Sequence, residues 1–104
     1  MSRSRLILLF ALALCGCESI ETTAPPVTDA LSRGAGGVPA EELKSGRKLL
    51  ALRCTSCHSL EPIAKYTPDE WRENVRAMAA RAGLSPAEER AVTAYLVAAR
   101  KVLP

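Results

Sequence analysis

Two cysteines and a histidine near the middle of the chain are its most chemically specific residues. Cys54 and Cys57 are three positions apart, and His58 follows directly. Residues at this spacing lie on one side of a helical turn, so both thiols can reach the two vinyl groups of one porphyrin and form thioethers. The adjacent imidazole then faces the iron. C-x-x-C-H is the attachment motif of c-type haem, and it predicts one covalently bound haem c at these three residues.

These residues could also serve three other uses. A structural zinc site needs four ligands, and the remaining cysteines, Cys15 and Cys17, lie far away near the N-terminus. A thioredoxin-like redox pair of Cys54 and Cys57 would need a βαβ context, which the sequence does not indicate. A simple structural disulfide is the third alternative. The adjacent His58 favours haem over all three.

The first 16 residues predict an export signal. Arg3 and Arg5 precede an apolar run, Leu6–Leu14, and small residues follow. This run is much shorter than the roughly 20 residues that a membrane-spanning helix needs. Without the two arginines the formal net charge falls from +3 to +1. The basic character of the whole chain therefore gives no indication of nucleic-acid binding, and none is expected.

The end of this signal resembles the bacterial lipoprotein box. Leu14-Cys15-Gly16-Cys17 has leucine, a small residue and a cysteine at the family's positions. The resemblance implies that Cys17 is lipidated, becomes the mature N-terminus and anchors the protein to a bacterial membrane at its periplasmic face. Residues 17–38 are rich in Thr, Pro, Ser, Gly and Ala and lack a helical period, so they are predicted to be a flexible linker.

The remaining residues, 39–104, predict one small all-α domain with three main helices. The first is expected from about Pro39 to Arg53. The second opens with the capping box Thr67–Glu70, carries an apolar stripe and ends at Gly83 in the left-handed conformation. The third opens with a second capping box, Ser85–Glu88. A domain of this size usually needs a metal, a disulfide or a covalent cofactor, and a buried haem would serve.

The sixth ligand of the iron is predicted by elimination. His58 is the only histidine of the chain, and Met1 leaves with the signal, so Met78 is the one methionine that remains. Met78 also falls on the apolar stripe of the second helix, where it could be an ordinary core residue. An open iron, or ligation by Lys65, are the alternatives. With a haem present, Met78 is the preferred distal ligand.

The sequence around the motif resembles class I cytochromes c, of the short bacterial monohaem type, over Glu41–Lys101. Gly46, eight residues before Cys54, matches the glycine at which the first and last helices of that family cross. Tyr95-Leu96 matches the pair of the closing helix that packs against this glycine. The resemblance implies a cytochrome c-like fold of a few α-helices wrapped around one covalently bound haem.

Two further residues are candidates for supporting roles. The resemblance implies that a proline after the motif accepts the second N–H of the haem-ligating histidine, and Pro62 is the nearest one; it could equally be a turn residue. Trp71 could donate a hydrogen bond to a haem propionate or pack in the core beside the haem.

The expected function is that of a membrane-tethered one-electron carrier and not of an enzyme. With His58 and Met78 both bound to iron, no coordination position is left for a substrate, and none is expected. The partners would be redox proteins of the periplasm or membrane, with the chain acting alone or as the cytochrome subunit of a dehydrogenase or oxidase. The alternatives are a haem enzyme or sensor with an open sixth position, and an exported thiol–disulfide oxidoreductase.

Overall fold

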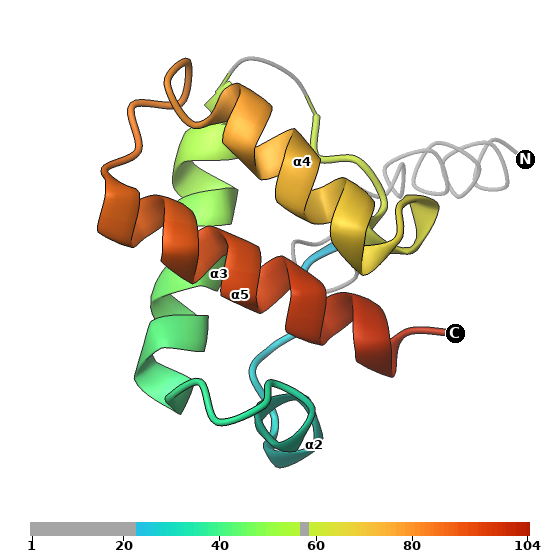
Figure 1. Ribbon diagram of the computed structural model, residues 1–104. Helices are drawn as coiled ribbons and strands as arrows, with labels where there is room; N and C mark the ends of the chain where they lie inside the picture. The colour runs from blue at the N-terminus through green and yellow to red at the C-terminus, as the bar shows by residue number, and fades with distance from the viewer. Residues whose placement is uncertain (1–22, 57–58) are drawn as a thin grey trace, which may run out of the picture.

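The computed structural model describes residues 23–56 and 59–104. Within them the fold is all-α, as predicted, with four α-helices, two short 3-10 helices and no strand. Figure 1 shows the longest helix, α5, crossing in front of α3, with α4 beside it and α2 near the start of the described chain. The elements are α2 (Asp29–Arg33), α3 (Ala40–Arg53), η1 (Cys54–Ser56), η2 (Ile63–Lys65), α4 (Pro68–Met78) and α5 (Pro86–Val102).

Two capping boxes begin the helices α4 and α5. The Thr67 hydroxyl accepts the N–H of Glu70, and the Glu70 carboxylate accepts the N–H of Thr67 at 2.7 Å. Ser85 and Glu88 repeat the arrangement, with 2.9 Å between the Ser85 nitrogen and the Glu88 carboxylate. Each box satisfies backbone donors that a helix start leaves without a partner. Both predicted helix starts are confirmed.

The end of α4 is also built by local hydrogen bonds. The helix itself ends at Met78, five residues before Gly83, where the sequence predicted its end, and the chain continues as turns. Gly83 has φ +68°, and its N–H bonds to the carbonyl of Ala80 while the N–H of Leu84 bonds to that of Ala79. This pair of bonds is the Schellman motif, in which a left-handed glycine closes a helix. The predicted conformation of Gly83 is confirmed.

The helices α3 and α5 cross at Gly46. Gly46 is buried, and a Cβ atom built there would lie 2.0 Å from the carbonyl oxygen of Ala91 and 3.0 Å from the Cβ of Tyr95. No side chain larger than hydrogen fits at this distance. The close approach of the first and last long helices at Gly46, with Tyr95 packed against it, agrees with the sequence-based expectation.

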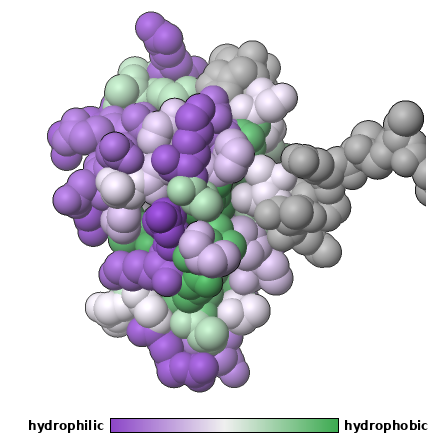
Figure 2. All heavy atoms as spheres, turned by 90° about the vertical axis from the view of Figure 1, so that its right-hand side faces the viewer, coloured by the Kyte–Doolittle hydropathy of each residue, from purple (hydrophilic) through white to green (hydrophobic). Residues whose placement is uncertain are grey.

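The core is formed mainly by the inner faces of α3, α4 and α5. Figure 2 views the molecule from the side on which α5 ends, and shows hydrophilic side chains over much of this face and a band of hydrophobic ones along its middle. Buried core residues come from every helix: Leu31, Leu43, Leu50, Trp71, Val75, Val92, Tyr95, Leu96 and Ala99, with Ile63 from η2. Among the described residues no helix has the length and apolar character needed to cross a membrane.

Residues 23–38, which we call the N-terminal strap, differ from the prediction. They were expected to belong to a flexible linker, but in the structure they pack on the helical domain and include the additional helix α2. Ala24 is 0% exposed and Leu31 is 1% exposed. The prediction was wrong for this part because it relied on a local hydrophobic period, which the strap's apolar residues do not have. They are buried by contacts with α3 and α5, which are distant in sequence.

Candidate functional site

An apolar pocket of about 240 Å³ lies between the end of α3, the loop after it, α4 and α5. Its walls are mostly aliphatic and aromatic side chains, and Asn74 and Glu61 are its polar members. The lining residues include Leu50, Cys54, Leu60, Tyr66, Trp71, Val75, Met78, Leu84 and Leu96. A pocket with apolar walls and few polar groups suits a hydrophobic ligand.

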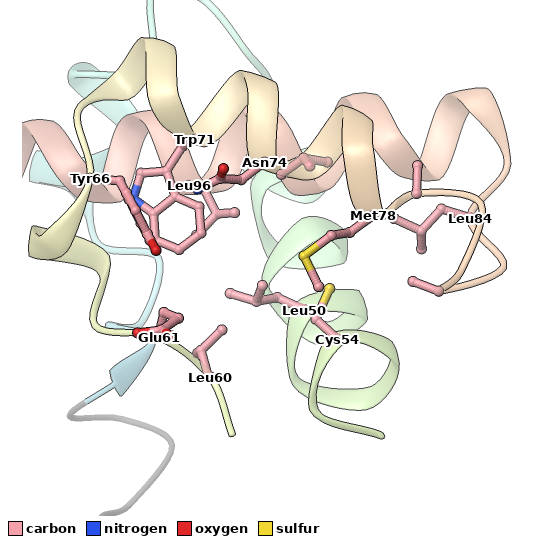
Figure 3. Close-up of a pocket in the computed structure, with 13 residues that line it drawn as sticks. Leu50, Cys54, Leu60, Glu61, Tyr66, Trp71, Asn74, Met78, Leu84 and Leu96 are labelled. Atoms are coloured by element: carbon pink, nitrogen blue, oxygen red, sulfur yellow. The ribbon is translucent and has the colours of Figure 1, made fainter. Parts of the chain in front are cut away.

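Two sulfur-bearing residues from different helices meet at this pocket. Cys54 follows the last residue of α3, and Met78 is the last residue of α4. Figure 3 shows their sulfur atoms pointing toward one another from these two helix ends. Both side chains are half-buried. The structure therefore brings together one cysteine of the C-x-x-C-H motif and the methionine that the sequence proposed as distal ligand.

Burial raises the pKa of the Cys54 thiol above its ordinary value. The thiolate is the reactive form of cysteine in disulfide exchange, and reactive cysteines have lowered pKa values. At neutral pH Cys54 is therefore protonated and a weak nucleophile.

Trp71 fixes the loop that follows the motif. Its indole nitrogen donates to the carbonyl of Ile63 at 2.8 Å, in a buried hydrogen bond. Its ring also meets that of Tyr66 edge-on, with 5.1 Å between centroids. An indole has one donor, so a hydrogen bond to a propionate would have to replace the bond to Ile63. Packing against a ligand in the pocket, the other predicted role of Trp71, needs no such exchange.

Pro62 and Lys65 lie in the same loop and outside the pocket lining. Pro62 is exposed and precedes η2, and its carbonyl accepts the N–H of Lys65 at 3.0 Å. The Lys65 ammonium bonds to Glu61 at 3.0 Å, and this hydrogen bond raises the pKa of Lys65. A protonated amine has no lone pair for a metal, so Lys65 is a poor candidate for the distal ligand in this conformation.

Arg53 connects the motif with the turn after Met78, a link that sequence reasoning missed. Its guanidinium donates to the carbonyl of Gly83 at 3.1 Å and lies 3.7 Å from the carboxylate of Glu88. Arg53 directly precedes Cys54, and Gly83 closes the turn that follows Met78. Arg53 thus links the two sulfur-bearing helix ends outside the pocket.

Several predicted site residues lie outside the described part of the chain. Cys57 and His58 fall in the gap at 57–58, and the signal segment and Cys17 fall within residues 1–22. The attachment of haem at Cys57, the proximal ligand His58 and the lipid anchor at Cys17 therefore stay predictions. The same gap leaves the role of Pro62 toward His58 untested.

Comparisons with known proteins do not identify a family or a function for the chain. No protein-family model, no curated protein and no solved structure matches the chain.

Proposed function

We propose that this chain is a membrane-tethered c-type cytochrome that carries one electron at a time. The observation that carries the proposal is the shared pocket of Cys54 and Met78. One belongs to a haem-attachment motif, and the other is the only methionine after the expected signal. They lie 24 positions apart in the sequence, yet both line one apolar cavity.

The donor set and the walls of the pocket fit a covalently held porphyrin. Cys54 and Cys57 would hold it through thioethers, and His58 and Met78 would be ligands of its iron. A bound haem supplies reversible one-electron chemistry at the iron. The aliphatic and aromatic walls would exclude water from it, and Leu50 and Leu96 are buried at the pocket already. Exclusion of water and a thioether ligand both favour a raised reduction potential.

Ligation by both His58 and Met78 is the reason for proposing a carrier and not an enzyme. A six-coordinate iron has no open position for a substrate. The partners would be redox proteins, which exchange electrons through small and quickly reversed contacts. The lipid expected on Cys17 would keep the carrier at the periplasmic face of a bacterial membrane.

The decisive experiment is to express the full chain in a host that exports proteins and attaches haem c. The purified protein should contain one covalent haem per chain in a pyridine haemochrome assay. Replacing both Cys54 and Cys57 with alanine should abolish covalent haem. Thr55→Ala is the matched control, because Thr55 lies between the two cysteines, is exposed and bonds only to the carbonyl of Ala51 among described groups.

The same preparation distinguishes the alternatives. Two free thiols and no haem in the exported protein would refute the proposal and favour a thiol–disulfide oxidoreductase. A covalent haem that binds carbon monoxide rapidly would instead indicate an open sixth position, as expected for a haem enzyme or sensor. A low-spin spectrum without carbon monoxide binding is the result expected for the carrier.

A further inference from the structure

The N-terminal strap is fastened to the domain at its very beginning. The Arg47 guanidinium donates to the carbonyl of Ala24 at 2.9 Å, and the Tyr95 hydroxyl donates to that of Pro25 at 2.5 Å. Ala24 is 0% exposed, and the Leu31 side chain of α2 is 1% exposed. Helix α2 packs against α5. Hydrogen bonds and apolar burial thus act on the same short segment.

This attachment shortens the chain between the expected lipid and the folded domain. An extended chain spans at most about 3.5 Å per residue, so Cys17 and Ala24 lie no more than about 25 Å apart in any conformation. A linker reaching to Pro39 would have allowed roughly 75 Å. The strap therefore shortens the greatest possible distance between the lipid and the folded domain by about two thirds, compared with the linker predicted from the sequence.

The proposed haem pocket lies close to this fastened end. Arg47, which holds Ala24, is seven residues before Cys54 on α3 and its continuation. At 1.5 Å per residue these positions are about 10 Å apart along the helix axis. A short anchor at the strap therefore also limits how far the pocket can move from the lipid.

We infer that the strap keeps the domain at the surface of the bilayer, so that its redox partner is a protein resident in the same membrane with its electron-exchanging group near that surface. The inference rests on the proposed function and on the lipid at Cys17. It excludes a partner that the domain could meet only by reaching far into the periplasm.

The reach can be measured by energy transfer in vesicles. The lipidated holoprotein is reconstituted into phosphatidylethanolamine–phosphatidylglycerol vesicles that contain a fluorescent headgroup-labelled lipid, and the haem quenches this dye at short range. Two variants carry the same 20-residue Gly-Ser insertion. One insertion follows Ser19, before the strap, and the other lies between Gly36 and Gly37, after α2. At both of these glycines an added Cβ meets nothing within 4 Å, so this exposed turn can accept added residues.

The position of the insertion decides the result. Before the strap, it raises the root-mean-square span from Cys17 to Ala24 from about 15 to about 30 Å, so quenching should fall by at least about half. Between Gly36 and Gly37 it forms a loop while the strap stays fastened, so quenching should be unchanged. An equal fall in both variants would mean that the strap is a free linker, and would overturn the inference. No fall in either would also overturn it, because something other than the short anchor would then hold the domain.

A second measurement tests the partner. In native membranes the insertion after Ser19 lowers the effective concentration of the domain near a partner at the membrane surface. Electron delivery to the haem should therefore slow several-fold. The Gly36–Gly37 insertion should leave the rate unchanged. Faster delivery with the longer anchor would overturn the assignment of a surface partner.

Failure of the proposed function would look different. Protein without a haem band refutes the proposed function and, with it, the redox partner. The free thiols of Cys54 and Cys57 then take an acceptor dye, so the short anchor is still tested by the quenching measurement. Protein that does not float with the vesicles has no lipid anchor, and that result overturns the inference while leaving the haem assignment intact.

Discussion

Gly46 of α3 and Ala91 of α5 are in backbone contact. A Cβ atom at position 46 would lie 2.0 Å from the carbonyl oxygen of Ala91 and 2.6 Å from its carbonyl carbon. Neither of these backbone atoms can turn away as a flexible side chain would. The contact sets the separation of the two longest helices, and Leu50 and Leu96, which lie one turn beyond it on the two helices, form part of the pocket wall.

Replacing Gly46 with alanine should therefore destabilise the holoprotein strongly. The added methyl group forces α3 and α5 apart, and we expect the free energy of unfolding to fall by about 3 kcal/mol. Denaturant unfolding measures this change. Gly34→Ala is the matched control, since an added Cβ there meets its nearest atom at 3.6 Å and φ is −74°. A loss below about 1 kcal/mol for Gly46→Ala would contradict the close crossing.

Tyr95 should make the folded state sensitive to alkali. Burial raises the pKa of its hydroxyl from 10.0 to about 12, an effect that the charge of Arg47 partly offsets. Between pH 10 and 12 the unfolded chain loses this proton while the folded chain keeps it. The stabilisation is thus complete below pH 10 and is lost as pH rises to 12, on the order of 2–3 kcal/mol in all.

Tyr95→Phe tests this dependence. The variant keeps the ring against Gly46 but loses the bond to the carbonyl of Pro25, which should cost about 1 kcal/mol at neutral pH. Above pH 10 its free energy of unfolding should fall less steeply than that of the parent chain. Parallel pH profiles for the two proteins, measured by denaturant unfolding, would count against a buried, neutral Tyr95 hydroxyl.

Glu88 should affect stability on the acid side. The backbone N–H of Ser85 donates to its carboxylate and lowers its pKa, and the nearby charge of Arg53 contributes in the same direction. The stabilisation from this group is present above the ordinary pKa of glutamate and is lost as pH falls through the lowered value. Glu88→Gln should flatten the acid limb of the stability profile. An unchanged acid limb in the Glu88→Gln variant, measured by denaturant unfolding across pH, would contradict this contribution of Glu88.

The long helices could be predicted because their signals are local. Thr67 with Glu70 and Ser85 with Glu88 are three residues apart, so each capping box is readable from a few letters, and Gly83 marks the turn that follows the second helix. The strap could not be predicted in this way. Its fastening depends on a hydrogen bond between Tyr95 and Pro25, 70 positions apart, and no local period indicates such a contact.

The candidate site, like the fold, could be predicted only in part. Met78 was identified because elimination leaves no other methionine, and the structure places it at the pocket with Cys54. The bonds from Arg53 to Gly83 and from Trp71 to Ile63 were missed. An arginine in an exposed position resembles any solvated charge, and the acceptor in both bonds is a backbone carbonyl, which carries no sequence signal.

Met78→Leu should convert the proposed carrier into a protein with an open iron. Leucine keeps the volume and apolar character of the pocket wall but has no lone pair, so the fold should be retained while the distal ligand is lost. We expect a high-spin visible spectrum, rapid binding of carbon monoxide and a lower reduction potential, since thioether ligation raises it.

The control for this variant is Leu84→Ile, another change in the lining of the same pocket that affects no sulfur. It should keep the low-spin spectrum and exclude carbon monoxide. If Met78→Leu also stays low-spin, another group ligates the iron. A further Lys65→Ala substitution would then show whether Lys65 leaves Glu61 to do so, because the spectrum of the double variant would become high-spin.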